Sequence, residues 1–273
     1  MIDIIKESLK ITNDNLIIAT PLILFSLIST LYMIFSSGGN SIGTLFSVIL
    51  FFLMLSAFLS GWFYMIAKVI KEPETNNKDK LIVEFPSGVG EYFLVIIGML
   101  IFTLLLSSII VLSAVLIGKK YIGSTGISQA QIIAAASNIE TMKNFANSLT
   151  NEQLIKINQW NLFILMTLMF NYFILMFYNP AIFFKKKNPF IAFFVSLKDL
   201  FGRKFFKNLT VFLLITVAYM FISILSAFLN SNIFLHFIFT LINFYYITFI
   251  AVFVFNYYYS NFAKIGGTID KTV

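Results

Sequence analysis

Residues 93–117 read FLVIIGMLIFTLLLSSIIVLSAVLI and contain no Asp, Glu, Lys or Arg. A helix needs about 20 apolar residues to cross the roughly 30 Å of hydrocarbon in a bilayer, so this stretch predicts a transmembrane helix. Five further charge-free stretches of similar length occupy residues 16–35, 45–66, 162–184, 209–229 and 233–255. The sequence therefore predicts an all-α, polytopic membrane protein whose residues 1–273 form a single domain of six transmembrane helices.

The composition supports the membrane as the solvent of this chain. Apolar residues make up 59% of the sequence and charged residues only 11%, whereas soluble domains average about 25% charged. The absence of cysteine excludes disulfides, thiolate metal sites and thiol nucleophiles. The first apolar stretch lacks an A-x-A-type cleavage site, which favours a retained first span over a signal peptide.

Basic residues alternate between the two sets of loops. The N-terminus, the loops 67–92 and 185–208, and the C-terminus carry fifteen Lys and Arg, whereas 36–44, 118–161 and 230–232 carry four. The positive-inside rule then places both termini in the cytoplasm. Because the net charge of +7 lies beside the spans, it does not indicate nucleic-acid binding. The heavy use of Phe, Ile, Asn and Lys is typical of AT-rich bacterial genomes, so we expect a bacterial inner-membrane protein.

Aromatic residues lie near the expected cytoplasmic borders, where amphipathic rings favour the headgroup level. Either such an interfacial belt or simply a Phe-rich composition explains them. They are Trp62, Tyr64, Tyr178, Tyr257, Tyr258 and Tyr259.

Three lead-in segments, 2–15, 81–92 and 189–208, each precede two spans joined on the outer side. The motif Ser8-Leu9-Lys10 ahead of Asn15 is similar to Ser196-Leu197-Lys198 ahead of Asn208. A parallel three-hairpin repeat, or biased composition alone, explains the similarity. In the second lead-in segment, Gly88-Val89-Gly90 is expected to turn the chain into the third span.

The third lead-in segment predicts an amphipathic interfacial helix. Ser196, Asp199 and the basic residues fall elsewhere around the helix. The apolar stripe contacts either lipid or the bundle's own cytoplasmic face. The stripe consists of Phe190, Phe193, Phe194, Leu197, Phe201 and Phe205.

The extracytoplasmic segment at about 118–158 is expected to be helical. Ser128–Gln131 and Thr150–Gln153 have the pattern of capping boxes, so each predicts the start of a helix. The first of these helices is expected to carry its apolar side from Ile132 to Leu149. The helices cap the bundle, bind a partner or merely connect the spans.

No catalytic, cofactor-binding or metal-ligating residues are predicted. His236 is the only histidine, and no H-E-x-x-H motif or intramembrane aspartate pair is present. The intramembrane amides Asn171, Asn243 and Asn256 either bond to neighbouring helices or line a path. Asn179-Pro180 is expected to kink or end the fourth span, because proline removes a backbone donor.

A resemblance to a known group of proteins rests on a few residues ahead of the fifth span. They are Pro180, the basic turn after it, and then Ala192, Ser196, Leu197 and Leu200. The chain resembles a group of bacterial six-span proteins that includes YciC-like proteins and the membrane domain of some glycerophosphodiester phosphodiesterases. The resemblance implies a helical six-span domain, and it transfers no catalytic residue. The long segment 118–158 departs from the group's compact pattern.

Two functions are compatible with these features. The first is a non-enzymatic scaffold or accessory domain for membrane lipids, a protein partner or a second copy of the chain. The alternative is a transporter or channel for a neutral or lipid-like solute.

Overall fold

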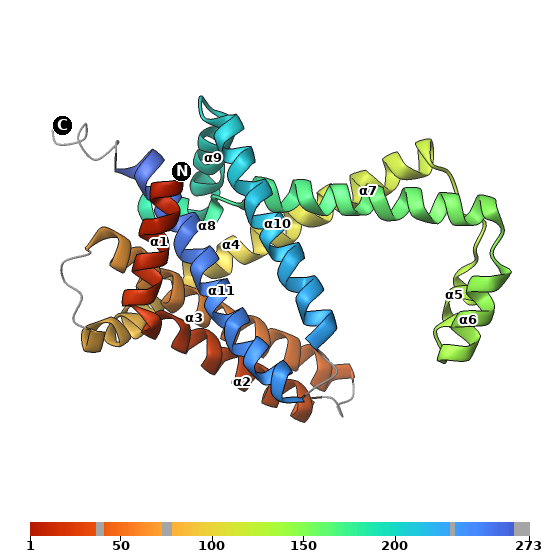
Figure 1. Cartoon of the computed structure of the whole chain (residues 1–273), viewed down its shortest axis with the longest axis horizontal. Helices are drawn as coiled ribbons and strands as arrows, with labels where there is room; N and C mark the ends of the chain where they lie inside the picture. The colour runs from red at the N-terminus through yellow and green to blue at the C-terminus, as the bar shows by residue number, and fades with distance from the viewer. Residues whose placement is uncertain (37–40, 73–77, 230–232, 265–273) are drawn as a thin grey trace. The chain divides into compact units, whose positions relative to one another are not determined.

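The structure, a computed structural model, describes residues 1–36, 41–72, 78–229 and 233–264. The predicted outer loops 36–44 and 230–232, and the basic residue Lys271, fall wholly or partly outside these ranges. Every secondary-structure element within them is helical. The elements are α1 (Ile2–Asp14), the short 3-10 helix η1 (Leu16–Ile18), α2 (Ala19–Ser36), α3 (Ser41–Lys71), α4 (Lys78–Tyr121), α5 (Gln129–Ala135), α6 (Ile139–Ser148), α7 (Asn151–Leu175), α8 (Tyr178–Phe184), α9 (Pro189–Phe201), α10 (Phe205–Leu229), α11 (Ile233–Tyr258) and the π-helical turn η3 (Tyr259–Ala263) (Figure 1).

Six helical segments are long and apolar enough to cross a membrane, which confirms the predicted all-α, six-span class. The chain divides into two compact units. Unit 1 combines residues 1–102 with 174–273, and unit 2 comprises residues 103–173. The helices α4 and α7 each contribute to both units, and the units are described separately below.

In unit 1, each lead-in segment packs on the last helix of another hairpin. Helix α1 lies along α11, where Asn256 Nδ2 donates to Ser8 Oγ over 3.1 Å (Figure 1). Helix α9 packs on α8. The start of α4 packs on α3, because Gly88 lies against Tyr64. The same kind of contact therefore recurs three times around unit 1, which supports the predicted three-hairpin plan.

Helix α4 runs unbroken through Pro86 and Gly88-Val89-Gly90, so the predicted turn at this motif is wrong. Gly88 has a different role. A Cβ atom there would lie 2.4 Å from Tyr64 Cβ and 2.9 Å from the Ser60 carbonyl oxygen. The missing side chain lets two helices approach closely, as small residues commonly do in membrane proteins.

Helix α9 begins at an Asn188 cap, whose side chain accepts from the backbone N–H of Ile191. The predicted apolar stripe does not coincide with its buried face. That face consists of Ala192, Phe193, Ser196 and Leu200. Ser196, which lies outside the predicted stripe, is fully buried, and its hydroxyl donates to the Phe193 carbonyl oxygen over 2.7 Å. The side chains of Phe190, Phe194 and Phe201 are exposed.

The break in the fourth span is confirmed. Helix α7 ends at Leu175, and α8 begins at Tyr178, one residue before Asn179-Pro180. The Phe177 carbonyl oxygen accepts the first backbone bond of α8, from the N–H of Ala181. The fourth span is therefore two helices rather than one.

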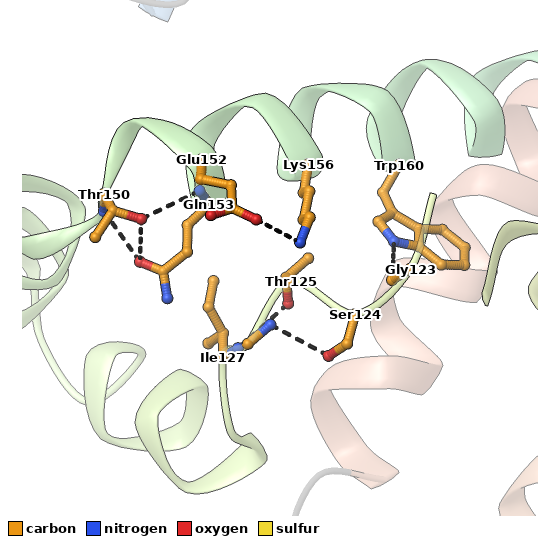
Figure 2. A network of polar contacts seen from close by, with 10 residues as sticks. Gly123, Ser124, Thr125, Ile127, Thr150, Glu152, Gln153, Lys156 and Trp160 are labelled. Carbon is orange, nitrogen blue, oxygen red and sulfur yellow. Dashed lines mark hydrogen bonds and ion pairs between the residues drawn. The ribbon is translucent and has the colours of Figure 1, made fainter. Parts of the chain in front are cut away.

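In unit 2, the α4 and α7 parts pack through a polar pair and a tryptophan. Asn171 Nδ2 donates to Ser107 Oγ over 3.0 Å. Trp160 lies against Gly118, where a Cβ atom would come within 2.3 Å of the indole ring. The indole N–H donates to the carbonyl oxygen of Gly123, a residue whose φ of +82° favours glycine (Figure 2).

Both predicted capping boxes are present in the outer segment. The backbone N–H of Gln131 donates to Ser128 Oγ. The backbone N–H of Gln153 donates in the same way to Thr150 Oγ1 (Figure 2). The helix expected from Ser128 to Leu149 is nevertheless two helices, α5 and α6. Asn138 starts the second helix by accepting from the N–H of Thr141. The backbone of Asn138 is extended, with φ of −159° and ψ of 171°, so one helix cannot run through this residue.

Candidate functional site

Two of the intramembrane amides each bond to a side chain of another helix within their own unit. Asn171 bonds to Ser107 in unit 2, and Asn256 bonds to Ser8 in unit 1. Asn243 is half-buried on α11. These contacts favour the packing explanation over a polar path. His236 lies exposed on α11, and no metal-binding group of three His, Asp or Glu side chains occurs within the described ranges.

Several of the aromatic residues near the expected borders pack between helices. Trp62, Tyr178, Tyr257 and Tyr258 are each less than 5% exposed and belong to the core of unit 1. The Trp62 indole N–H donates to the Ile18 carbonyl oxygen. These rings fill the space between helices, where their polar atoms mostly find partners.

The basic loops come together at one end of unit 1. Lys71 Nζ, at the end of α3, donates to the Phe183 carbonyl oxygen over 3.0 Å. Lys185, after α8, pairs with Asp199 of α9 at 2.8 Å. Lys204, before α10, reaches Asn261 of η3. Segments far apart in the sequence therefore share one basic end.

Asp199 connects α9 to the last span. Its Oδ2 atom accepts from both Lys185 Nζ and the hydroxyl of Tyr258, the latter over 2.6 Å. Lys185 Nζ also lies 5.4 Å from the centre of the Tyr258 ring. A half-buried carboxylate, a lysine and a buried tyrosine thus stabilise one another at the junction of three helices.

Asn208 is a second junction, and it is fully buried. Its Nδ2 atom donates to the carbonyl oxygens of Asp199 and Leu200, over 3.1 and 2.9 Å. Its Oδ1 atom accepts from the hydroxyl of Tyr257 over 2.9 Å. These carbonyls belong to the last turn of α9, where no intrahelical donor is left for them. Asn208 therefore joins α9, α10 and α11.

Asn261 holds two lysines at the same end. Lys204 Nζ donates to its Oδ1 atom over 3.0 Å, and Lys207 Nζ donates to the same atom over 3.2 Å. The amide is oriented by its own Nδ2 atom, which donates to the Tyr257 carbonyl oxygen. Burial, and then the nearby ammonium of Lys207, lower the pKa of Lys204 from its ordinary value.

We define the basic–aromatic end as the residues of this region: Lys71, Lys185, Asp199, Lys204, Lys207, Asn208, Tyr257, Tyr258, Asn261 and Phe262. The sequence indicated that its lysines lie on one side of the membrane, but not that Asp199, Asn208 and Asn261 hold them. In the sequence, Asp199 and Asn208 belonged to the third lead-in segment and Asn261 followed the sixth span, and the pattern did not indicate their partners.

Chemically, the basic–aromatic end can attract anions and has a rigid polar framework. The helices α9 and α10, which contribute to this end, also carry exposed apolar side chains, since Phe194, Phe201 and Phe206 are 66%, 50% and 80% exposed. Cations next to exposed aromatic side chains suit the headgroup level of a bilayer.

Comparisons of the chain with protein-family models, with curated proteins and with solved structures found no match. The resemblance to the YciC-like group and to the phosphodiesterase membrane domain therefore stays an expectation from a few residues.

Proposed function

We propose that this chain is a non-enzymatic protein of the bacterial inner membrane that acts as a scaffold or accessory domain for lipid or protein partners. The observation that carries the proposal is the two-sided α9 helix. One side packs on unit 1 through Phe193 and Leu200, while Phe194 and Phe201 stay exposed beside the basic–aromatic end. A helix held in this way presents apolar and basic groups together to a lipid surface.

The arrangement of unit 1 also supports the proposed topology. Lys71, Lys185 and Lys204 come from separate parts of the chain that the positive-inside rule assigns to one side. Helix α1, at the N-terminus, packs on α11, the last span. Both termini are proposed to be cytoplasmic, and a second copy of this chain is one of the proposed partners.

Replacing Phe194 and Phe201 with glutamine is expected to reduce the lipid and protein that co-purify with the full-length protein from native membranes. Burial of two half-exposed Phe side chains contributes about 2 kcal/mol, so at least a tenfold weaker association is expected. The measurement is quantitative mass spectrometry of lipids and proteins in the purified sample.

The matched control is F194L/F201L, which keeps the exposed face apolar and should retain the wild-type association. Both variants should keep the wild-type melting temperature, since the altered side chains are exposed. Equal recovery of lipids and partners with the glutamine and leucine variants would contradict the role of α9.

We propose transport of a neutral or lipid-like solute as the second candidate, because of the break between α7 and α8. Tyr178 is 2% exposed, and its hydroxyl has no hydrogen-bond partner within the described part of the chain. The Asn179 Oδ1 atom beside it is likewise buried and unpartnered there. Unpaired polar groups at a broken transmembrane helix are typical of solute and ion sites.

If this second candidate is correct, vesicles containing the wild-type protein should conduct glycerol or scramble a labelled phospholipid. The Tyr178→Phe variant should be several-fold slower but no less stable, because it removes an unpaired buried hydroxyl. Stopped-flow light scattering and lipid-scrambling assays measure the two activities. Wild-type vesicles that match protein-free vesicles would eliminate this candidate.

A further inference from the structure

Lys204 and Lys207 differ from the neighbouring lysines in their hydrogen-bond partners. Lys185 pairs with Asp199, and Lys187 pairs with Glu91. Lys204 and Lys207 form no ion pair with a described carboxylate, and both donate to the neutral amide oxygen of Asn261. Two ammonium groups that share one oxygen atom lie close together and repel each other.

The protein holds this pair in place. Asn261 is 8% exposed, and Lys204 also donates to its backbone carbonyl oxygen over 3.1 Å. The Lys204 ammonium lies 5.4 Å from the centre of the Phe262 ring, and that of Lys207 lies 5.6 Å from the centre of the Tyr257 ring. The ammonium groups are thus partly withdrawn from water before any ligand binds, which strengthens their interaction with an anion.

The surroundings indicate what kind of anion fits. Lys204 immediately precedes the apolar helix α10, and Phe206, which lies between the two lysines in sequence, is 80% exposed. Phe201 is 50% exposed and stacks on Phe205 at 5.8 Å. Phe201 and Phe206 are thus exposed within three residues of Lys204 along the chain. A ligand that combines a negative group with hydrocarbon can contact both the lysines and these rings. An anionic phospholipid has this combination, and free phosphate does not.

We propose that Lys204, Lys207 and Asn261 form a binding site for the phosphate group of an anionic phospholipid, whose acyl chains lie along Phe201 and Phe206. The proposal deepens the proposed scaffold function and rests on it. The bound phosphate accepts hydrogen bonds from both ammonium groups and relieves their mutual repulsion.

The test uses full-length protein in nanodiscs that contain phosphatidylcholine with increasing phosphatidylglycerol, and it counts bound anionic lipid by native mass spectrometry. The variant K204Q/K207Q should bind phosphatidylglycerol at least tenfold more weakly than wild type, because each lysine near a lipid surface contributes about a factor of five. Binding of phosphatidylcholine should not change.

The matched control is K186Q/K198Q, which removes the same charge from two exposed lysines of the same loop. It should lose less than twofold in phosphatidylglycerol binding. An equal loss in both double variants would overturn the site in favour of general surface charge, and no loss in K204Q/K207Q would overturn it directly.

A competition arm separates the two sources of phosphate. Inorganic phosphate and glycerol 3-phosphate at millimolar concentration should not displace the bound lipid, and displacement by either would overturn the assignment to a lipid. If the wild-type protein retains no lipid at all, the scaffold function for lipids fails. If the wild-type protein and K204Q/K207Q retain the same amount of lipid, the proposed site is wrong but the scaffold function is not.

Discussion

Replacing Gly88 with alanine is expected to lower the free energy of unfolding by about 3 kcal/mol, whereas the same change at Gly90 leaves it unchanged or raises it by up to about 1 kcal/mol. At Gly88 the new methyl group would lie 2.4 Å from Tyr64 Cβ. Because Cβ is fixed to the backbone, α3 and α4 must move apart to accept it. At Gly90 the new methyl group would have no described atom within 4 Å other than those of its own helical turn.

The two glycines are two residues apart in one helix, so G90A controls for helix propensity and for purification. The free energy of unfolding is measured by steric trapping or by SDS titration in mixed micelles. Comparable stability of the G88A and G90A variants would show that the close contact of α3 and α4 is absent in the membrane.

The six spans were predictable because they depend on a local property. A charge-free stretch of about 20 residues has few alternatives to a transmembrane helix, whatever its neighbours. The break near Pro180 and the capping boxes at Ser128 and Thr150 were equally local, since each depends on residues within one turn.

The buried faces were not predictable in this way. Apolar residues on all sides of a transmembrane helix are compatible with lipid, so hydrophobicity does not distinguish the lipid side from the packed side. In α9 the packed side is marked by the small residues Ala192 and Ser196, whereas the large Phe194 and Phe201 remain exposed. Small residues at four-residue spacing were the better guide there. The sequence-based expectation followed the large ones.

The candidate site depended on contacts between residues distant in sequence. Asp199, Asn208 and Asn261 come from separate elements, and their partners are Tyr258, Tyr257 and two lysines. In the sequence the tyrosines stood near a predicted border, where an interfacial belt was one of two explanations for them. Only the fold shows that α9 and η3 cover them.

Replacing Asn208 with leucine is expected to have the largest effect within the basic–aromatic end. Leucine is close in size but can neither donate to the Asp199 and Leu200 carbonyl oxygens nor accept from the Tyr257 hydroxyl. Three buried polar groups then lose their partner, so the free energy of unfolding should fall by about 3–5 kcal/mol. The control Thr210→Val should change it by less than about 0.5 kcal/mol, because the exposed Thr210 hydroxyl bonds only within its own helix.

A double variant distinguishes the loss of these bonds from a general disturbance of packing. In N208L/Y257F the unpaired tyrosine hydroxyl is also removed, so the double variant should be about 1 kcal/mol more stable than the sum of the two single effects predicts. The same unfolding measurement on the four proteins of the cycle gives this coupling. If the effects of N208L and Y257F simply add, the hydrogen bond between Asn208 and Tyr257 contributes nothing to stability. The contacts of Asp199 would then be what holds the basic–aromatic end together. Lys204 and Lys207 shortly precede Asn208 in the chain, and Asn261 follows Tyr257 by one turn. N208L should therefore also weaken binding of anionic lipid, while Thr210→Val should not.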